Sequence, residues 1–322
     1  MSPWIRHLLG LMLALAFATT ASAQTASFPP VVRVIVPFAA GAGTDVLARA
    51  VVSQLGPRLG TNVIVENRPG AAGAIGVAAV AKGPRDGSML LFHSTSLVTA
   101  AATARSVSFD VTKDLMPVAI VADGPMLVGV SAASGIRTPA DWVAAARGRP
   151  QGLTAGSGGI GSVGHLAVEL LSDAANVQVR HIPYRGAAPA LTDVAAGTVD
   201  MLIASYSTIG PQVRSGRVVP IAVTSAQSSP SFPGLPTMAS AAPGYETSIW
   251  YAMFAPSGTP GVLMQRLHRE INDIARSGEV SRLVEADGAL PVNAPPEELA
   301  ARVRRDFEIW KKIATEKQIL VD

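Results

Sequence analysis

Cysteine is absent from the 322 residues of this chain, which excludes thiol nucleophiles, disulfide bonds and cysteine-ligated metals. Charge is also sparse: Asp, Glu, Lys and Arg make up 15% of the sequence, and the formal net charge is +3. Because the basic residues are scattered and not interleaved with aromatic residues, nothing indicates nucleic acid binding. The histidines are dispersed, and the one pair at helical spacing, His165 and Glu169, is more typical of a helix surface than of a metal site.

Long apolar runs are lacking too, and the nearest approach to one lies at the N-terminus. Residues 8–18 form an apolar segment that follows Arg6 and His7 and precedes Ala21-Ser22-Ala23. The segment is shorter than the about 20 residues that span a bilayer, and this arrangement is typical of a signal peptide. We predict that residues 1–23 are a signal peptide cleaved near Ala23 and that the mature chain is periplasmic. A buried N-terminal helix is the alternative.

The rest of the chain consists of short β-rich runs that alternate with helical patterns such as residues 46–55 and 163–174. This alternation predicts an α/β fold with mostly parallel sheets covered by helices. The length predicts two lobes, because single cores stop growing at roughly 250–300 residues. The predicted strands are residues 32–36, 63–66, 89–94, 116–121, 127–130, 152–155, 178–183, 199–204 and 218–224.

The alternation of short strands and helices ends after Gly244. A strand is predicted over residues 248–255, and three helices follow at residues 261–276, 279–286 and 296–318. The last helix carries one apolar stripe, which favours packing onto a lobe over binding a partner. The stripe consists of Leu299, Val303, Phe307, Trp310 and Ile313.

Two glycine-rich turns each connect a predicted strand to a predicted helix. The first is "VVRVIVPFAAGAGTDV", residues 31–46, in which Thr44 or Asp45 is a possible helix cap. It lacks the Gly-Lys-Ser/Thr of a P-loop, and Val46 stands where G-x-G-x-x-G has its third glycine. The second is "LTAGSGGIGSVGHLAVELL", residues 153–171, with a predicted cap at Ser162. Each is either a structural turn or an anion site at a helix N-terminus, and the pair predicts two anion sites that face one cleft.

Ser157 in the second turn raises the alternative of a serine hydrolase. The stretch Ala155-Gly156-Ser157-Gly158-Gly159 lacks the first glycine of the G-x-S-x-G elbow. His165 and His181 are candidate bases, and the distance from a histidine to Ser157 is expected to distinguish a hydrolase from a binding protein. A nucleotide-dependent enzyme is a third class, but an acidic ribose contact is not recognisable. Downstream, Tyr184 follows a predicted strand, at the carboxyl end where open parallel sheets bind ligands.

Seven stretches, in this order, resemble the Bug-type periplasmic receptors of tripartite tricarboxylate transporters. They cover nearly the whole mature chain, and their ordered set is more specific than any one of them. The stretches are "VRVIVPFAAGAGTDVLAR", "VIVENRPGAAGAIGVAAVAKGPRDGSMLL", "AGSGGIGSVGHLAVELL", "VRHIPYRGAAPALTDVAAGTVDML", "SGRVVPIAVTS", "LPTMASAAPGYETSIWYAMFAPSGTP" and a C-terminal helix with Trp310.

The resemblance implies a type II periplasmic-binding-protein fold, in which two α/β lobes close on a small carboxylate. Lobe 1 would comprise residues 24–124 and 248–322, and lobe 2 residues 125–247. Backbone amides, hydroxyls and waters of two facing loops would hold the ligand. Carried over by position, the implied ligand-binding residues are Phe38, Ala40, Gly41, Ala42, Gly43, Thr44, Asp45, Ser94, Ser96, Ser157, Gly158, Ile160, Ser162, His165, Tyr184, Ser205 and Ser207.

The chain departs from the family pattern at three places that concern ligand choice. Alanine occupies positions 40 and 42 where the family commonly reads P-G-G-x-x-D, Ser205-Tyr206 replaces a common acidic or Asn pair, and "HSTSLVTAAATA" lacks an Asn-Pro. We expect an exported, monomeric binding protein for an organic carboxylate, without catalysis, metal or cofactor. Its expected partner is a membrane permease, and a sensor kinase is the alternative.

Overall fold

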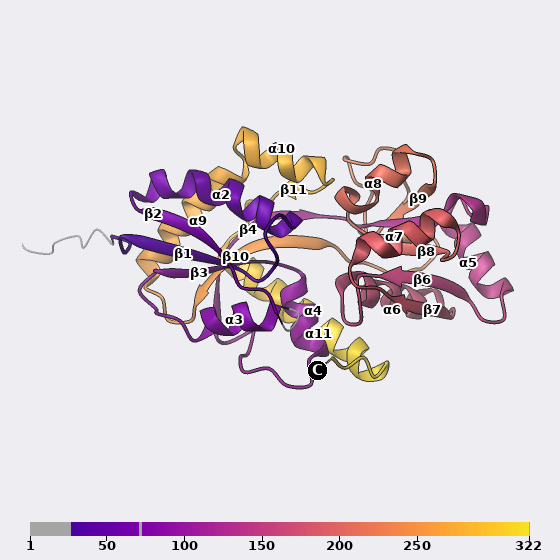
Figure 1. Ribbon diagram of the computed structural model, residues 1–322, viewed down its shortest axis with the longest axis horizontal. Coiled ribbons are helices and arrows are strands. Elements are labelled where there is room, and N and C mark those ends of the chain that lie inside the picture. Colours follow the sequence, from indigo (N-terminus) through magenta and orange to yellow (C-terminus); the bar gives the residue numbers. More distant parts are fainter. Residues whose placement is uncertain (1–26, 71–72, 322) are drawn as a thin grey trace, which may run out of the picture.

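The computed structural model describes residues 27–70 and 73–321. The predicted signal peptide lies outside the described residues. Figure 1 shows two α/β units side by side, each built around its own sheet. Within the described part, no helix is long and apolar enough to cross a membrane.

The first sheet has six strands in the order β11-β4-β10-β3-β1-β2. In its parallel part, β1 lies between β2 and β3 and runs in the same direction as both. The strand β10 is antiparallel to its neighbours β3 and β4. The strands are β1 (Val31–Val36), β2 (Asn62–Asn67), β3 (Met89–Ser94), β4 (Leu115–Gly124), β10 (Ile249–Pro256) and β11 (Leu290–Pro291). The helices of this unit are α2 (Gly43–Leu59), α3 (Ala74–Ala81), α4 (Ser96–Thr103), α9 (Gly261–Ala275), α10 (Gly278–Ala286) and α11 (Pro296–Glu316).

The second sheet has five strands in the order β7-β6-β8-β5-β9. Here β6 is parallel to β7 and β8, and β5 is antiparallel to β8 and β9. The strands are β5 (Leu127–Ser131), β6 (Leu153–Ser157), β7 (Val179–Pro183), β8 (Met201–Ala204) and β9 (Val218–Val223). The helices are α5 (Pro139–Gly148), α6 (Val163–Ala175), α7 (Ala187–Ala196) and α8 (Tyr206–Arg214), with 3₁₀ turns η2 (Ala132–Ser134) and η3 (Met238–Ser240).

Both sheets are mixed, where the sequence predicted mostly parallel ones. The parallel prediction holds for the strand–helix–strand runs β1–β3 and β6–β8. It fails at β5 and β10, the two strands that follow the passages of the chain from one sheet to the other, since each enters its sheet against the direction of its neighbours. The predicted α/β class is correct, and the chain passes between the sheets just after Gly124 and just before Ile249.

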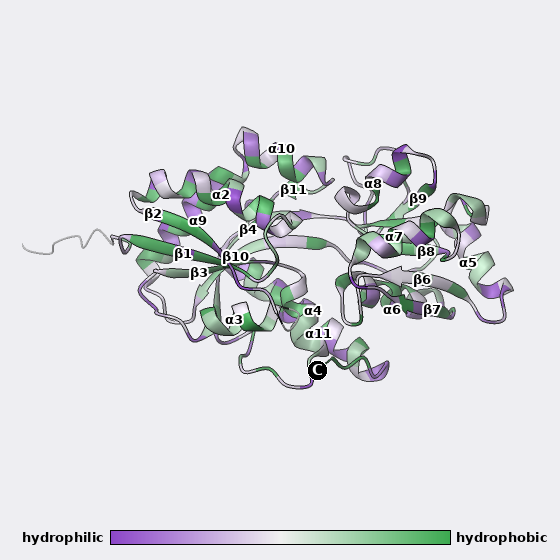
Figure 2. Ribbon diagram, in the orientation of Figure 1, coloured by the Kyte–Doolittle hydropathy of each residue, from purple (hydrophilic) through white to green (hydrophobic). Residues whose placement is uncertain are grey.

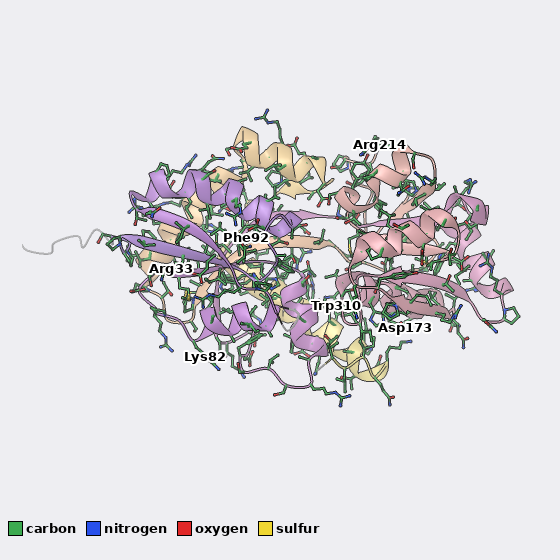
Figure 3. The ribbon with its side chains drawn as sticks, viewed as in Figure 1. Arg33, Lys82, Phe92, Asp173, Arg214 and Trp310 are labelled. Carbon is green, nitrogen blue, oxygen red and sulfur yellow. The ribbon has the colours of Figure 1, made fainter. Side chains whose placement is uncertain are left out.

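Each sheet has a separate apolar core on each of its faces. Figure 2 shows the hydrophobic residues of strands such as β1 in green. The predicted stripe of α11 packs against one face of the first sheet, with Leu299, Val303, Trp310 and Ile313 buried in its core. Just beyond α11, Lys317 pairs with Asp173 of α6, a residue labelled in Figure 3. The C-terminal helix therefore joins the core of the first unit and also contacts the second.

Arg302 of α11 ties together the two passages between the sheets. Its guanidinium donates to Asp123 at the end of β4 and to Ser248 just before β10, and the Ser248 hydroxyl also donates to Asp123 at 2.7 Å. Burial lowers the pKa of Arg302, but the charges and hydrogen bonds of Asp123 and Asp306 outweigh burial and raise it. The guanidinium is thus held charged at the place where both chain passages meet.

Candidate binding site

The first glycine-rich turn is held by the carboxylate of Asp45, which lies inside α2 and is buried. This carboxylate accepts hydrogen bonds from the Gly41 N–H at 2.8 Å, from Arg49 Nε at 2.9 Å and from Asn67 Nδ2 at 2.8 Å. Burial alone raises the pKa of Asp45, but these three hydrogen bonds outweigh it and hold the pKa below its ordinary value. Asp45 and the Gly41 amide therefore shape the loop and are engaged with each other.

The start of α2 differs from the prediction. The N-cap is Ala42, so neither Thr44 nor Asp45 caps the helix; both lie inside its first turn. Ala42 has extended backbone angles (φ −66°, ψ 154°) that suit any residue, and α2 has no side-chain cap among the described residues. In that part of the chain, the N–H groups of Gly43, Thr44 and Asp45 have no acceptor. This leaves the positive end of α2 open toward an anion.

The second turn is held by a hydroxyl and an imidazole. Ser157 Oγ lies 2.6 Å from His181 Nε2 and accepts from the Gly159 N–H at 3.1 Å. The His181 ring stacks on the ring of His165, with centroids 3.6 Å apart and planes 13° from parallel. Ser162 caps α6 by accepting from the His165 N–H at 3.3 Å, as predicted. Within the described residues, the second turn is therefore closed by its own side chains.

The close approach of Ser157 and His181 meets the distance criterion set for a hydrolase, but three features do not fit one. Among the described residues no carboxylate contacts His181, because Glu169 lies beside His165 instead, with Oε1 3.6 Å from His165 Nε2. Burial, followed by the neighbouring His165, lowers the pKa of His181 to about 4, which makes it a weak base at neutral pH. Ser157 itself is only 3% exposed.

A cavity of about 440 Å³ lies between the two turns. Residues 37–39 line it from the first turn and Gly158, Ile160, Gly161 and Ser162 from the second. The remaining lining comes from residues 69, 70, 73, 74 and 77, from β3 and α4, from residues 104, 106, 107 and 109, and from Val321. A cavity of this size is typical of a small-molecule site.

The helix starts around this cavity give it a positive potential without cationic side chains. The first residues of α3 and α4 and the N-cap of α6 all belong to its lining. Among the lining residues there is no Asp, Glu, Lys or Arg. Helix N-termini favour an anion, and most of the lining side chains are apolar, so the cavity suits an anion with an apolar body.

The predicted site residues divide into two groups. Five line the cavity: Phe38, Ser96, Gly158, Ile160 and Ser162. The other twelve are not among its lining, and several have their polar groups engaged elsewhere: Ala40, Gly41, Ala42, Gly43, Thr44, Asp45, Ser94, Ser157, His165, Tyr184, Ser205 and Ser207.

Tyr184 and Ser207 are the clearest examples of such engagement. The Tyr184 hydroxyl donates to Asp193, and burial together with this carboxylate raises the pKa of Tyr184 to about 12. The Ser207 N–H, in the first turn of α8, donates to Asp287 Oδ1 at 2.6 Å. Burial raises the pKa of Asp287 despite its hydrogen bonds from Ser207, Ser205 and Tyr251. The place that the sequence assigned to the distal part of a ligand therefore holds a carboxylate of the chain itself.

Sequence reasoning missed His93 and the lining residues Pro69, Gly70, Gly73 and Ala74. His93 is one of the dispersed histidines and was weighed only as a metal ligand. The glycines at 70 and 73 were a usable signal, since both have positive φ, 121° and 97°, a conformation in which glycine lets the backbone approach a ligand closely.

The sequence profile described as "Tripartite tricarboxylate transporter family receptor" matches residues 47–319. A "UPF0065 protein in tcbD-tcbE intergenic region" of Pseudomonas sp. (strain P51) is 36% identical over 317 residues, covering 98% of this chain and 94% of that protein.

Two solved structures are also similar to this chain in sequence and in fold. "R. palustris Rpa4515 with adipate" is 32% identical with a TM-score of 0.78, covering 90% of this chain and 98% of the other. The "periplasmic binding protein BugD" is 30% identical with a TM-score of 0.76, covering 91% and 99%. The fold, the cavity between two helix-opening turns and these matches together establish that the chain belongs to the receptor family of the tripartite tricarboxylate transporters, the Bug-type solute-binding proteins.

Proposed function

We propose that this protein captures a small organic carboxylate in the cavity between its two units and passes it to the membrane permease of a tripartite tricarboxylate transporter. The observation that carries the proposal is the cavity itself. Turns from both sheets line it, the starts of three helices belong to its lining, and among its lining residues none is charged. The adipate in the solved relative from R. palustris is a ligand of this chemical class.

Lobe 1 in this proposal comprises residues 24–124 and 248–322, and lobe 2 residues 125–247. The assignment of the strands to two sheets supports these boundaries, as does the Arg302 clamp on Asp123 and Ser248. Closure of the lobes would bring the two turns together around the ligand. The Asp287–Ser207 contact is then one of the bonds that closure forms.

The decisive experiment changes charge at Ser162, which lines the cavity and caps α6. Asp and Asn are both good N-caps, so Ser162→Asp and Ser162→Asn preserve the helix and differ mainly by one negative charge. A thermal-shift screen of carboxylates, adipate included, identifies a ligand, and calorimetry then gives its affinity. We expect the Asp variant to bind at least about tenfold more weakly than the Asn variant, because like charges a few Å apart repel strongly in a half-buried site. Equal affinities of the two variants would refute the site.

The protein is proposed to release its ligand unchanged, with no covalent chemistry at Ser157. The low pKa of His181 and the burial of Ser157 support this. A fluorophosphonate probe, which labels activated serines, is expected to leave the wild type unlabelled. Labelling that disappears in Ser157→Ala would instead establish a hydrolase.

The protein is also proposed to be exported and to act together with a membrane permease. The chain is proposed to be a periplasmic monomer whose residues 1–23 are removed, so that the mature protein recovered from the periplasm begins at Gln24. Deletion of the permease genes should abolish uptake of the ligand while leaving its binding intact. If instead a sensor kinase is the partner, ligand-dependent gene expression would be lost with this protein and uptake would be unaffected.

A further inference from the structure

One buried ring nitrogen stands unpaired in the wall of the cavity. His93, in β3, has no exposed surface, and its Nε2 has no hydrogen-bond partner among the described residues. The residue belongs to the cavity lining, and buried polar groups without a partner are rare in proteins. A ligand atom that reached Nε2 would supply the missing hydrogen bond.

The surroundings of His93 serve either neutral tautomer. Nδ1 lies 2.9 Å from the Ser94 amide nitrogen, from which it can accept, and 3.0 Å from the Ser94 carbonyl oxygen, to which it can donate. Burial lowers the pKa of His93 to about 4, so the ring is neutral near pH 7. When Nδ1 accepts from the Ser94 N–H, the proton is on Nε2, and this is the tautomer that an anionic ligand oxygen would select. In that tautomer His93 offers one uncharged N–H donor.

The position of Nε2 is kept open by Gly73 and set by Phe38. A Cβ on Gly73 would lie 3.4 Å from His93 Nε2 and 3.3 Å from Pro37 Cβ, so any other residue would crowd this space. Phe38 packs edge-on against the imidazole, with ring centroids 5.1 Å apart. The donor is thus held in a fixed orientation by the first turn.

The larger lining side chains other than His93 are apolar. Val77, Leu97, Val107, Phe109, Ile160 and Val321 line the cavity, as does Phe38. The Thr103 hydroxyl, also in the lining, already donates to the Thr99 carbonyl at 2.9 Å. A second carboxylate there would lose its hydration with no cation to replace it, whereas an apolar chain or ring would fill the space favourably.

We propose that His93 is a ligand-binding residue that donates from Nε2–H to an oxygen of the ligand, and that the ligand is a monocarboxylate with an apolar aliphatic or aromatic body. This inference rests on the proposed function and narrows its ligand class. It assigns specificity to β3 and to the walls formed by α3, α4 and residue 321, in addition to the two glycine-rich turns.

Acids matched in carbon number test the ligand class. Hexanoate and adipate both have six carbons and differ in the number of carboxylates, and benzoate and terephthalate extend the comparison to aromatic bodies. Calorimetry on the mature chain is expected to give at least tenfold tighter binding for hexanoate or benzoate than for the corresponding diacid. If a diacid binds more tightly, this inference is overturned while the proposed function stands. If none of the library of carboxylates binds, both fail.

Two variants test His93 itself. In His93→Gln the amide nitrogen can take the place of Nε2, whereas His93→Phe keeps a ring and removes the donor; both leave the Ser94 N–H without its acceptor. The Phe variant is expected to bind the preferred monocarboxylate about tenfold more weakly than the Gln variant at a similar melting temperature. Equal affinities would remove His93 from the site.

A measurement on the wild type avoids the question of folding. In protein labelled with ¹⁵N-histidine, the Nε2–H resonance of His93 should shift downfield and exchange more slowly with water when the monocarboxylate is added. A resonance that is unchanged at saturation would overturn the assignment.

Discussion

The two glycine-rich turns have the same plan, a strand that runs through glycines into a helix, but they are held in different ways. The first is fixed by a carboxylate from its own helix, Asp45, which gathers three donors. The second is fixed by the Ser157 hydroxyl and the stacked rings of His165 and His181. A carboxylate stays charged down to acidic pH, whereas a buried imidazole loses its neutral state sooner. The two turns are therefore expected to differ in strength and in the pH at which each fails.

They also differ in what they offer a ligand. The first turn leaves the N–H groups at the start of α2 open, because its N-cap is Ala42. The second turn uses Ser162 to close the start of α6. The first turn lines the cavity with residues 37–39, while the open start of α2 lies outside the lining, and the second turn lines it with Gly158, Ile160 and Ser162.

The largest effect is expected at Asp45. Asp45→Ala leaves the Gly41 N–H without its acceptor and the Asn67 amide with only the Phe38 carbonyl. The change should lower the free energy of unfolding by about 3 kcal/mol, as for other broken buried charge networks. Arg49→Ala is the matched control, because Arg49 is about half exposed and removing such a partner costs about 1 kcal/mol or less. Urea denaturation of both variants makes the measurement. A loss at Asp45 no greater than that at Arg49 would contradict the anchoring role.

A pH titration should separate the two turns. His181 has a folded pKa of about 4 against an ordinary value of 6.5, so the unfolded chain binds the proton more readily and stability falls as pH drops from 6.5 toward 4. The loss is at most about 1.4 kcal/mol per pH unit for one such group. His93 has a similarly low pKa and adds to the slope. The pKa of Asp45 is depressed below 3.8, so its contribution is lost only at still lower pH.

The variant His181→Gln isolates the part of this slope that belongs to the second turn. Its side-chain amide can still hydrogen-bond to Ser157 but does not titrate. The free energy of unfolding, measured between pH 7 and 4.5, should therefore fall less steeply than in the wild type. The difference in slope corresponds to at most one proton taken up on unfolding. A slope identical to that of the wild type would show that His181 is not responsible.

The sequence predicted most of the fold because its elements are locally determined. The predicted run 89–94 coincides with β3, and the predicted α6 and its cap at Ser162 are correct. The stripe of α11 was readable since helical periodicity and burial agree there. The antiparallel insertion of β5 and β10 was not readable, because strand direction depends on the path of the chain between the sheets and not on any local pattern.

The candidate site was predicted less completely, for a related reason. The resemblance to the receptor family implied residues 38, 96, 158, 160 and 162 as site residues, and all five line the cavity. No sequence pattern points to His93 as a site residue. Its place in the cavity wall depends on Phe38, Gly73 and Ser94, which surround it only in the folded chain. Asp45 and Tyr184 have strong signals as polar residues near the turns, but their groups bond to the protein itself.

The smallest effect expected, and the sharpest comparison of the two turns, comes from exchanging their caps. Ala42→Ser supplies a hydroxyl that can accept from the N–H of Thr44 or Asp45 and should stabilise the protein by about 0.5–1 kcal/mol. Ser162→Ala removes the bond from the His165 N–H and should cost about 1 kcal/mol. Thermal unfolding of both variants gives the two values.

Ligand affinity distinguishes a mere change of stability from a change of the site. Because the serine in Ala42→Ser occupies an N–H that is otherwise free for an anion, this variant should be more stable and yet bind the carboxylate more weakly, by a few fold. A stabilised variant with unchanged affinity would mean that the open end of α2 takes no part in binding, and the positive potential of the site would then come from α3, α4 and α6 alone. Opposite signs of the two effects in one variant would instead locate part of the affinity in the uncapped helix, where Ala42 replaces the family's glycine.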